Sequence, residues 1–305
     1  MPLGCGLGFS RVRSSARPSL DLSFNTMLTP DIRMTNTRST GGSYFNSSGI
    51  LQTAAANAVR FDHDPATHAS LGLLLESQAT NLASWSTDLT KWGATGGTSS
   101  NISATPPDGP STATTLCLPS NVTVYFDTSI SIVTVYVASV WLWATGSNIG
   151  KTISLKLRDI THAVWLSGSP TITLTETPTR YAFAATPASG CVSVRMALYG
   201  TADAPTFFAW GAQLEAGSTA SSYIASLAGA QTTRAADTAT ALLDSGSYDV
   251  LVQDAAGAEW RNGITVSGSP LPLSPRAGRT VIGRVRAFRA GILGTDHKSA
   301  LLTPA

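Results

Sequence analysis

The sequence contains few charged residues and few cysteines. Charged side chains make up 12% of its 305 residues, against about 25% in an average globular protein. A net charge of +2 is too close to zero to indicate binding to nucleic acid. The three cysteines, Cys5, Cys117 and Cys191, include no C-x-x-C pair, so we expect neither a disulfide framework nor a zinc site. For Cys117 and Cys191 we favour buried free thiols, with a bridge between them as the open alternative.

Long apolar runs are also missing. The most apolar stretch, residues 130–144, is shorter than the roughly 20 residues that a membrane helix needs, and it includes serine and threonine. We expect a core strand or strand pair there, and no membrane insertion. The short apolar stretch at residues 3–9 precedes the first arginines instead of following them. This order is the reverse of a secretory signal peptide, so none is expected.

Motifs for catalysis and metal binding are absent from the sequence. Its four histidines belong to no H-E-x-x-H helix, and neither a G-x-S-x-G elbow nor a P-loop occurs. The one dense polar cluster is Asp62-His63-Asp64 with His68. Neighbouring residues on a strand point to opposite faces, and Asp64 followed by proline indicates a turn, so a turn is favoured over a metal site. No carboxylate pair for glycoside hydrolysis is recognisable. We expect no enzyme, no metal and no cofactor.

Short alternating segments dominate what is present. Apolar and polar residues alternate at positions 153–157, 171–175 and 192–198, and this period of two is typical of antiparallel sheets with one buried face. Turn-forming residues recur at short spacing, for example at 106–109 and 167–170. The pattern predicts a mainly β protein that contains an antiparallel β-sandwich of the jelly-roll type.

The changes in composition along the chain divide it into five segments. The first has several glycines, basic residues and too few apolar residues to fold alone, and the fourth is rich in Ala, Thr and Gly. We expect a flexible basic arm at 1–17, a β-rich attachment or base segment at 18–80, the jelly roll at 81–226, a linker at 227–241 and a small C-terminal β module at 242–305.

Aromatic residues in the middle segment offer two interpretations. Trp141 and Trp143 share one face of their predicted strand, and we expect them to fill the sandwich core, where large aromatic side chains bury most area. Trp165 stands next to a polar turn, and core and surface positions remain equally open for it. Flat aromatic rings can stack on sugar rings. The candidate carbohydrate contacts on the outward face are Trp165 and Tyr125, with Asn148 and Asp159 as polar partners.

Three groups of residues carry a family resemblance. They are Ser19–Asn25 with Thr37–Leu82 (including GGSYFNSSGILQTAAANAVRFD), Trp85–Trp92 with Pro106–Leu116 (WSTDLTKW and PPDGPSTATTL), and Phe207–Asp237 (FFAWGAQLEAGSTASSYIASLAGAQTTRAAD). Together they resemble structural proteins of tailed bacteriophages, the head spike fibre or tail fibre proteins, and the related spikes of gene transfer agents. The resemblance spans roughly residues 18–240.

This resemblance implies a jelly roll like that of carbohydrate-binding modules, in a virion component that is not an enzyme. It implies a homo-oligomer on the surface of a virion or phage-like particle, assembled in the bacterial cytoplasm. Its partners would be other virion proteins and host-surface polysaccharide. We expect Arg11, Arg13 and Arg17 of the arm to contribute to attachment to the particle.

Several alternatives remain open at this stage. The chain could be a tail fibre subunit with polysaccharide depolymerase activity, or a secreted carbohydrate-binding lectin. A head position and a tail position are both open, as are a trimer and a pentamer.

Overall fold

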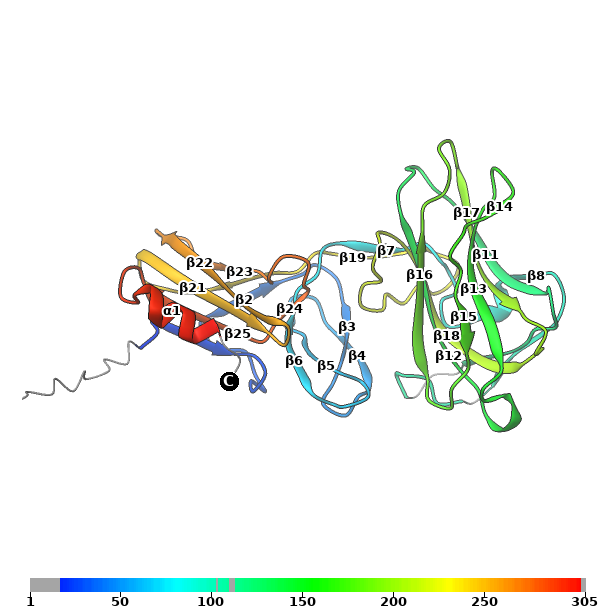
Figure 1. Ribbon diagram of the computed structural model, residues 1–305, viewed down its shortest axis with the longest axis horizontal. Coiled ribbons are helices and arrows are strands. Elements are labelled where there is room, and N and C mark those ends of the chain that lie inside the picture. The colour runs from blue at the N-terminus through cyan, green and yellow to red at the C-terminus, as the bar shows by residue number, and fades with distance from the viewer. Residues whose placement is uncertain (1–16, 103, 110–112, 303–305) are drawn as a thin grey trace, which may run out of the picture.

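The computed structural model describes residues 17–102, 104–109 and 113–302 of the chain. The described residues form antiparallel sheets throughout, with a single short α-helix, α1 (Thr295–Leu302), near the C-terminus. The predicted fold class, mainly β with a β-sandwich, is confirmed. Figure 1 shows an elongated molecule with the sandwich at one end and a second β body at the other. Within the described ranges, no helix is long and apolar enough to cross a membrane.

The sandwich consists of a five-stranded sheet, in the order β16-β12-β18-β10-β9, and a six-stranded sheet, in the order β14-β13-β17-β11-β8 with β15 paired to β13. Its short 3-10 helices are η1 (Leu89–Lys91) and η2 (Gly146–Asn148). Its strands are β8 (Gly93–Ala94), β9 (Thr98–Ile102), β10 (Ala113–Cys117), β11 (Thr123–Ser129), β12 (Tyr136–Trp143), β13 (Thr152–Asp159), β14 (Val164–Trp165), β15 (Thr171–Thr173), β16 (Thr179–Ala185), β17 (Ser193–Gly200) and β18 (Thr206–Ala216).

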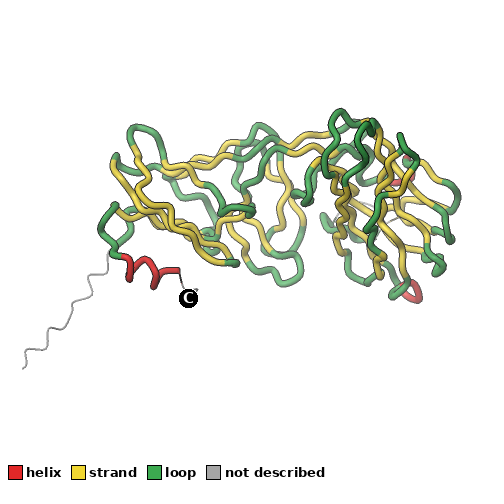
Figure 2. Tube along the Cα trace, turned by 45° about the horizontal axis from the view of Figure 1, so that its top comes forward, coloured by secondary structure: helices red, strands yellow, loops and turns green. Residues whose placement is uncertain are grey.

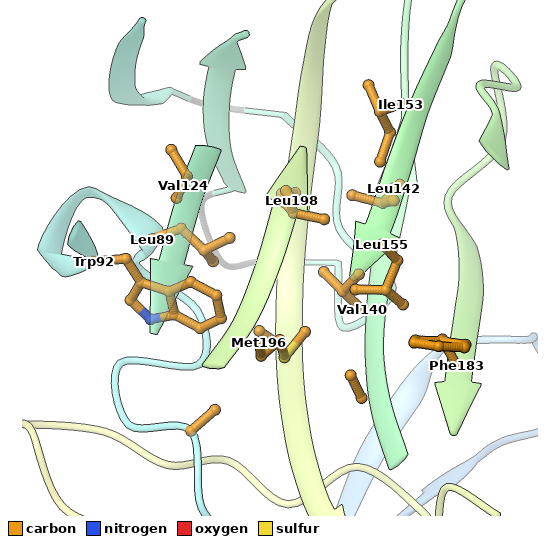
Figure 3. Close-up of a cluster of buried hydrophobic side chains, with 14 of the residues drawn as sticks. Leu89, Trp92, Val124, Val140, Leu142, Ile153, Leu155, Phe183, Met196 and Leu198 are labelled. Carbon is orange, nitrogen blue, oxygen red and sulfur yellow. The ribbon is translucent and has the colours of Figure 1, made fainter. Parts of the chain in front are cut away.

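The residues whose alternation predicted the strands lie in the space between the two sheets, together with apolar residues of β12 and β18. Ile153, Leu155 and Leu157 of β13 are fully buried, and Figure 3 shows Leu155 beside Val140 of the opposite sheet. Each buried aliphatic side chain of this kind contributes roughly 1.5–3 kcal/mol. Val192 departs from the pattern: it precedes β17 and is 61% exposed.

The second body, which we call the end body, is built from both ends of the chain. β1 (Leu20–Ser23) pairs with β25 (Arg284–Arg289), and Leu20 stands opposite Ala287. β6 (Ser70–Leu74) likewise pairs with β24 (Val281–Ile282). The other strands are β2 (Met34–Thr37), β3 (Gly42–Phe45), β4 (Leu51–Ala54), β5 (Phe61–His63), β20 (Thr238–Ala241), β21 (Gly246–Asp254), β22 (Gly257–Val266) and β23 (Leu271–Leu273).

Residues 18–80 and 242–302 therefore share sheets and one apolar core, although the sequence suggested two separate segments. Leu22 and Phe24 from the N-terminal part pack in the same buried cluster as Tyr248 and Val285 from the C-terminal part. Local patterns do not reveal this arrangement, because the alternation of apolar and polar residues identifies a strand without identifying its partner. The sandwich is thus inserted between the two halves of the end body.

Two strands cross between the end body and the sandwich. β7 (Ala79–Asn81) leads into the sandwich and β19 (Thr232–Arg234) leads out of it, and the two pair with each other. Residues 227–241, which we expected to be a linker, thus contain β19 and β20. Threonine dominates both strands, and its β-propensity accounts for this difference. Figure 2 shows the same narrow crossing from another direction.

Candidate functional site

The solvent-facing side of the six-stranded sheet gathers aromatic and basic residues. On β13, Leu155 and Leu157 point into the core, so Lys156 and Arg158 point outward. Arg158 stands opposite Trp165 on β14 and Arg195 on β17, and directly paired residues share a face. The same rule places Tyr199 and Tyr125 on this side. We call this surface the aromatic–cation face; it comprises Tyr125, Lys156, Arg158, Trp165, Arg195 and Tyr199.

Trp165 and Tyr199 form the centre of the aromatic–cation face. Their rings meet edge to face, with centroids 5.9 Å apart and planes at 84°. The Lys156 ammonium lies 3.7 Å from the Tyr199 centroid and 5.4 Å from that of Trp165. The Arg158 guanidinium lies 5.4 Å from the Trp165 centroid. These cation–π contacts place both positive charges beside half-buried rings.

Tyr125 is held more tightly than Trp165. A Cβ on Gly93 would come within 2.6 Å of the Tyr125 ring, so this ring lies directly over the glycine. The Arg195 guanidinium is 3.4 Å from the ring centroid and also binds Asp127 through two hydrogen bonds of 2.6 and 2.7 Å. Hydrogen bonding to Asp127 raises the pKa of Arg195. Tyr125 is therefore fixed between Gly93 and Arg195, while Trp165 and Tyr199 contact each other at the centre of the aromatic–cation face.

The structure turns Asp159 away from this face. Asp159 stands opposite Val164, one position beyond the Arg158–Trp165 pair, and it is only 1% exposed. Its carboxylate accepts hydrogen bonds from the backbone and Nδ1 of His162, at 2.9 and 2.8 Å, and from the Ala188 amide at 3.2 Å. Burial alone would raise the pKa of Asp159, but these hydrogen bonds lower it to about 2. Asp159 thus fixes the loop that leads to Trp165.

The other residues singled out from the sequence lie elsewhere. Asn148 belongs to η2, which precedes the first residue of β13, whereas Trp165 pairs near the last residues of that strand. The Asn148 Oδ1 accepts hydrogen bonds from the Lys151 ammonium and the Thr206 amide. Arg17 is exposed at the start of the end body. Arg11 and Arg13 lie outside the described residues. The aromatic–cation face therefore brings together two of the four predicted carbohydrate contacts, Trp165 and Tyr125.

Trp141 and Trp143 are buried as expected, but not between the two sheets. Alternate residues of β12, such as Val140 and Leu142, occupy the sandwich core, so the two tryptophans project from the outer side of the five-stranded sheet. There they pack with Trp210, Tyr223 and Leu51, and Leu51 comes from β4 of the end body. All eight residues of β12 are buried. A continuous apolar run of this kind indicates a strand covered on both faces.

A cavity of about 430 Å³ lies beside these tryptophans, where the five-stranded sheet meets the end body. It is lined by Trp141, Arg180 and three carboxylates, Asp62, Glu76 and Glu215. Ser221 donates hydrogen bonds to Glu215 through its amide and hydroxyl, and Ser222 donates to Glu76 in the same way. Burial lowers the pKa of Arg180 to about 10. The two glutamates are therefore engaged in holding the chain at residues 221–222.

Buried ion pairs continue from this cavity into the crossing between the two bodies. Asp237 pairs with Arg38 at 2.8 Å and also with Arg60, and all three side chains are 0% exposed. Arg60 pairs with Glu76 at 2.8 Å as well, and Arg234 lies 3.6 Å from both carboxylates. We call these five residues the joint network. Sequence reasoning missed it because its members lie up to 199 positions apart.

Asp62 and His63 of the polar cluster belong to β5, and the chain turns after Asp64, where the sequence predicted a turn. Asp64 accepts hydrogen bonds from the amides of Ala66 and Thr67, at 3.0 and 2.7 Å. Among the described residues, no group of three or more His, Cys, Asp or Glu side chains could hold a metal ion. Cys117 and Cys191 are free thiols as expected, but only Cys191 is buried, and Cys117 is partly exposed.

Comparison with known proteins yields distant structural similarities alone. No protein-family model matches the sequence, and no curated protein sequence matches it. The enzymatically active domain of tailspike protein 4 from bacteriophage CBA120 is similar with a TM-score of 0.34 and 16% identity, over 44% of this chain and 21% of that one. The carbohydrate-binding module TmCBM61, in complex with β-1,4-galactotriose, is similar with a TM-score of 0.33 and 13% identity, over 45% of this chain and 99% of that one.

The CBM22-1–GH10 modules of the Clostridium thermocellum endo-1,4-β-D-xylanase 10B, in complex with xylohexaose, give a TM-score of 0.38 and 10% identity. That similarity covers 49% of this chain and 30% of the xylanase chain. The chain is thus distantly similar in structure to carbohydrate-binding modules and to a phage tailspike domain. At such low similarity, the function has to be argued from the residues of this chain.

Proposed function

We propose that this protein is a structural subunit of a spike or fibre on a phage-like particle, and that its aromatic–cation face binds host-surface polysaccharide. The observation that carries the binding proposal is the Trp165–Tyr199 pair, which presents two rings and adjacent hydrogen-bond donors on the outside of a rigid sheet. Sugars have apolar C–H faces and hydroxyl edges, and this combination suits both. The sequence resemblance to phage spike and fibre proteins supports the setting on a particle.

The shape of the molecule supports different roles for its two ends, attachment for the end body and glycan contact for the sandwich. The first and last described residues both belong to the end body, and the sandwich lies at the opposite end (Figure 1). A chain anchored through its end body would hold the sandwich away from the particle. The arm, with Arg11, Arg13 and Arg17, would then contribute to attachment. Several weak sites on one particle bind strongly together, because each later contact is effectively intramolecular.

We propose further that the protein binds polysaccharide without cleaving it. The cavity between the five-stranded sheet and the end body is lined by three carboxylates, Asp62, Glu76 and Glu215. A depolymerase, the alternative function, would need a pair of carboxylates, and this cavity is where such a pair would lie. Two of them, Glu76 and Glu215, are engaged by serine hydrogen bonds, and Glu76 also pairs with Arg60. Release of new reducing ends from host polysaccharide by the pure protein would contradict this proposal.

Binding of purified protein to immobilised envelope polysaccharide from a susceptible bacterium tests the proposed function. Trp165→Ala is expected to lower the affinity about tenfold or more, since loss of roughly 1.4 kcal/mol has that effect. Trp260→Ala is the matched control, because Trp260 is a half-buried tryptophan in the end body that also has a lysine near its ring. Equal affinities for the wild type and a folded Trp165→Ala variant would contradict the proposal.

A further inference from the structure

The aromatic–cation face carries more positive than negative charge. Arg195 is neutralised by Asp127 through paired hydrogen bonds. Lys156 and Arg158 form no ion pair with any carboxylate of the described residues, and Arg158 donates one hydrogen bond, to the Ala163 carbonyl at 3.2 Å. The Arg158 Nε is buried without a hydrogen-bond partner. Two cations therefore stand beside the Trp165–Tyr199 pair with unused capacity to bind an anion.

The positions of these cations matter for the kind of sugar that can bind. Lys156 lies close over the Tyr199 ring, and both Lys156 and Arg158 flank Trp165. A neutral glycan that stacked on the rings would displace or desolvate these charges without supplying a counter-charge, and this is costly. A sugar that carries a carboxylate would pair with the same cations while its ring lies against Trp165. A guanidinium also matches a carboxylate in geometry.

We infer that the aromatic–cation face selects acidic polysaccharide, with Lys156 and Arg158 binding the carboxylates of uronic acid residues and Trp165 stacking on the adjoining sugar. This inference rests on the proposed polysaccharide binding. It assigns specificity to the two cations and general glycan contact to the aromatic pair. Because the pairing is electrostatic and exposed to solvent, binding weakens as the salt concentration rises.

Matched polymers with and without charge provide the test. The full-length protein is titrated with polygalacturonate, alginate and hyaluronan, and with the carboxyl-reduced form of each, which keeps the backbone but loses the charge. We expect at least one acidic polymer to bind about tenfold or more tightly than its reduced form, since a hydrogen bond to a charged group contributes an effect of that size. The double variant Lys156→Gln/Arg158→Gln should lose this preference, and Lys156→Arg should keep it.

A charge-matched control separates this site from general attraction between a basic protein and a polyanion. Lys91→Gln/Arg33→Gln removes the same charge from η1 and the end body, and it should bind like the wild type. Acidic binding that survives the Lys156/Arg158 double variant, or equal binding of acidic and reduced polymers, overturns the inference while leaving the proposed function standing. Failure of all six polymers and of the envelope polysaccharide to bind overturns both. Thermal unfolding of each variant establishes that it is folded.

Discussion

Asp159 shows how one buried side chain positions a surface aromatic residue. Its carboxylate ties together His162 and Ala188 beneath the loop that precedes Trp165. The carboxylate is charged in the folded protein at any pH well above 2, because hydrogen bonding outweighs burial and keeps its pKa at about 2. A depressed pKa means that the folded state favours the charged form, so the bonds stabilise the fold above pH 4.

We therefore predict that the contribution of Asp159 is present above the ordinary aspartate pKa of 3.8 and is lost as the pH falls from about 4 to 2. Asp159→Asn should lower the free energy of unfolding by roughly 2 kcal/mol at neutral pH and by little near pH 2. Urea unfolding at several pH values measures this difference. The exposed Glu176→Gln serves as control. A difference that does not change with pH would contradict the account.

The residues of the candidate site were partly readable from the sequence. Burial of alternate residues in β13 and β17 places Lys156 outside by periodicity alone, and the same rule applied to Leu198 would have identified Tyr199. Asp159 was misplaced because its polar side chain suggested an outward position, although the alternation of Ile153, Leu155 and Leu157, continued by two residues, puts it on the inward side of β13. The cation–π contacts of Lys156 with Tyr199 and of Arg195 with Tyr125 join neighbouring strands. Such contacts cannot be predicted from the pattern of residues along one strand.

Among the elements, the crossing strands β7 and β19 depend on the joint network for their fixed position. Asp237 accepts charge-assisted hydrogen bonds from Arg38 and Arg60, which come from the N-terminal part of the end body. It also accepts a hydrogen bond from the backbone amide of Glu76 at 3.0 Å. Removing one partner from such a network leaves buried arginines without compensation. The penalty is larger than the net stabilisation that the intact pairs provide.

Asp237→Asn is accordingly expected to lower the free energy of unfolding by roughly 3–5 kcal/mol. Asp21→Asn is the control from the same body, since Asp21 pairs with Arg284 at 2.6 Å but both side chains are more than a third exposed. That exposed pair should contribute about 0–1 kcal/mol. Chemical denaturation of the two variants compares them directly. Similar losses in both would show that burial does not set the strength of these pairs.

The sequence predicted the positions of the strands better than it predicted which strands pair with each other. Alternation and turn residues located most of the sandwich, and in the end body a turn at Gly49, with a φ of +70°, joins β3 and β4. The pairing of β1 with β25 places Leu20 opposite Ala287, and the side chains of Asp21 and Arg284, 263 positions apart, form hydrogen bonds across it. Pairing at that distance is decided by the shared core of the end body, to which residues 20–75 contribute five buried side chains and residues 239–287 contribute eleven.

At the scale of the whole molecule, the end-to-end arrangement of the two bodies is consistent with the proposed binding of polysaccharide by the sandwich. The sandwich is inserted into the end body and joined to it by two paired strands, a shared aromatic cluster and the joint network. Figures 1 and 2 both show the two bodies end to end. If the end body is anchored to a particle as proposed, a glycan contact at the opposite end of the subunit would reach the host surface first, and the joint would hold neighbouring sites in a fixed arrangement for multivalent binding.

The most direct test of the central claim is the indole N–H spectrum of the intact protein during titration with envelope polysaccharide from a susceptible bacterium. The chain has seven tryptophans, and each gives its own indole signal, which single substitutions assign. The account predicts that the Trp165 signal shifts with polysaccharide concentration, while those of the buried Trp141, Trp143 and Trp210 and of Trp260 in the end body do not. A saturable shift at Trp260, or binding that leaves Trp165 unchanged, would contradict it.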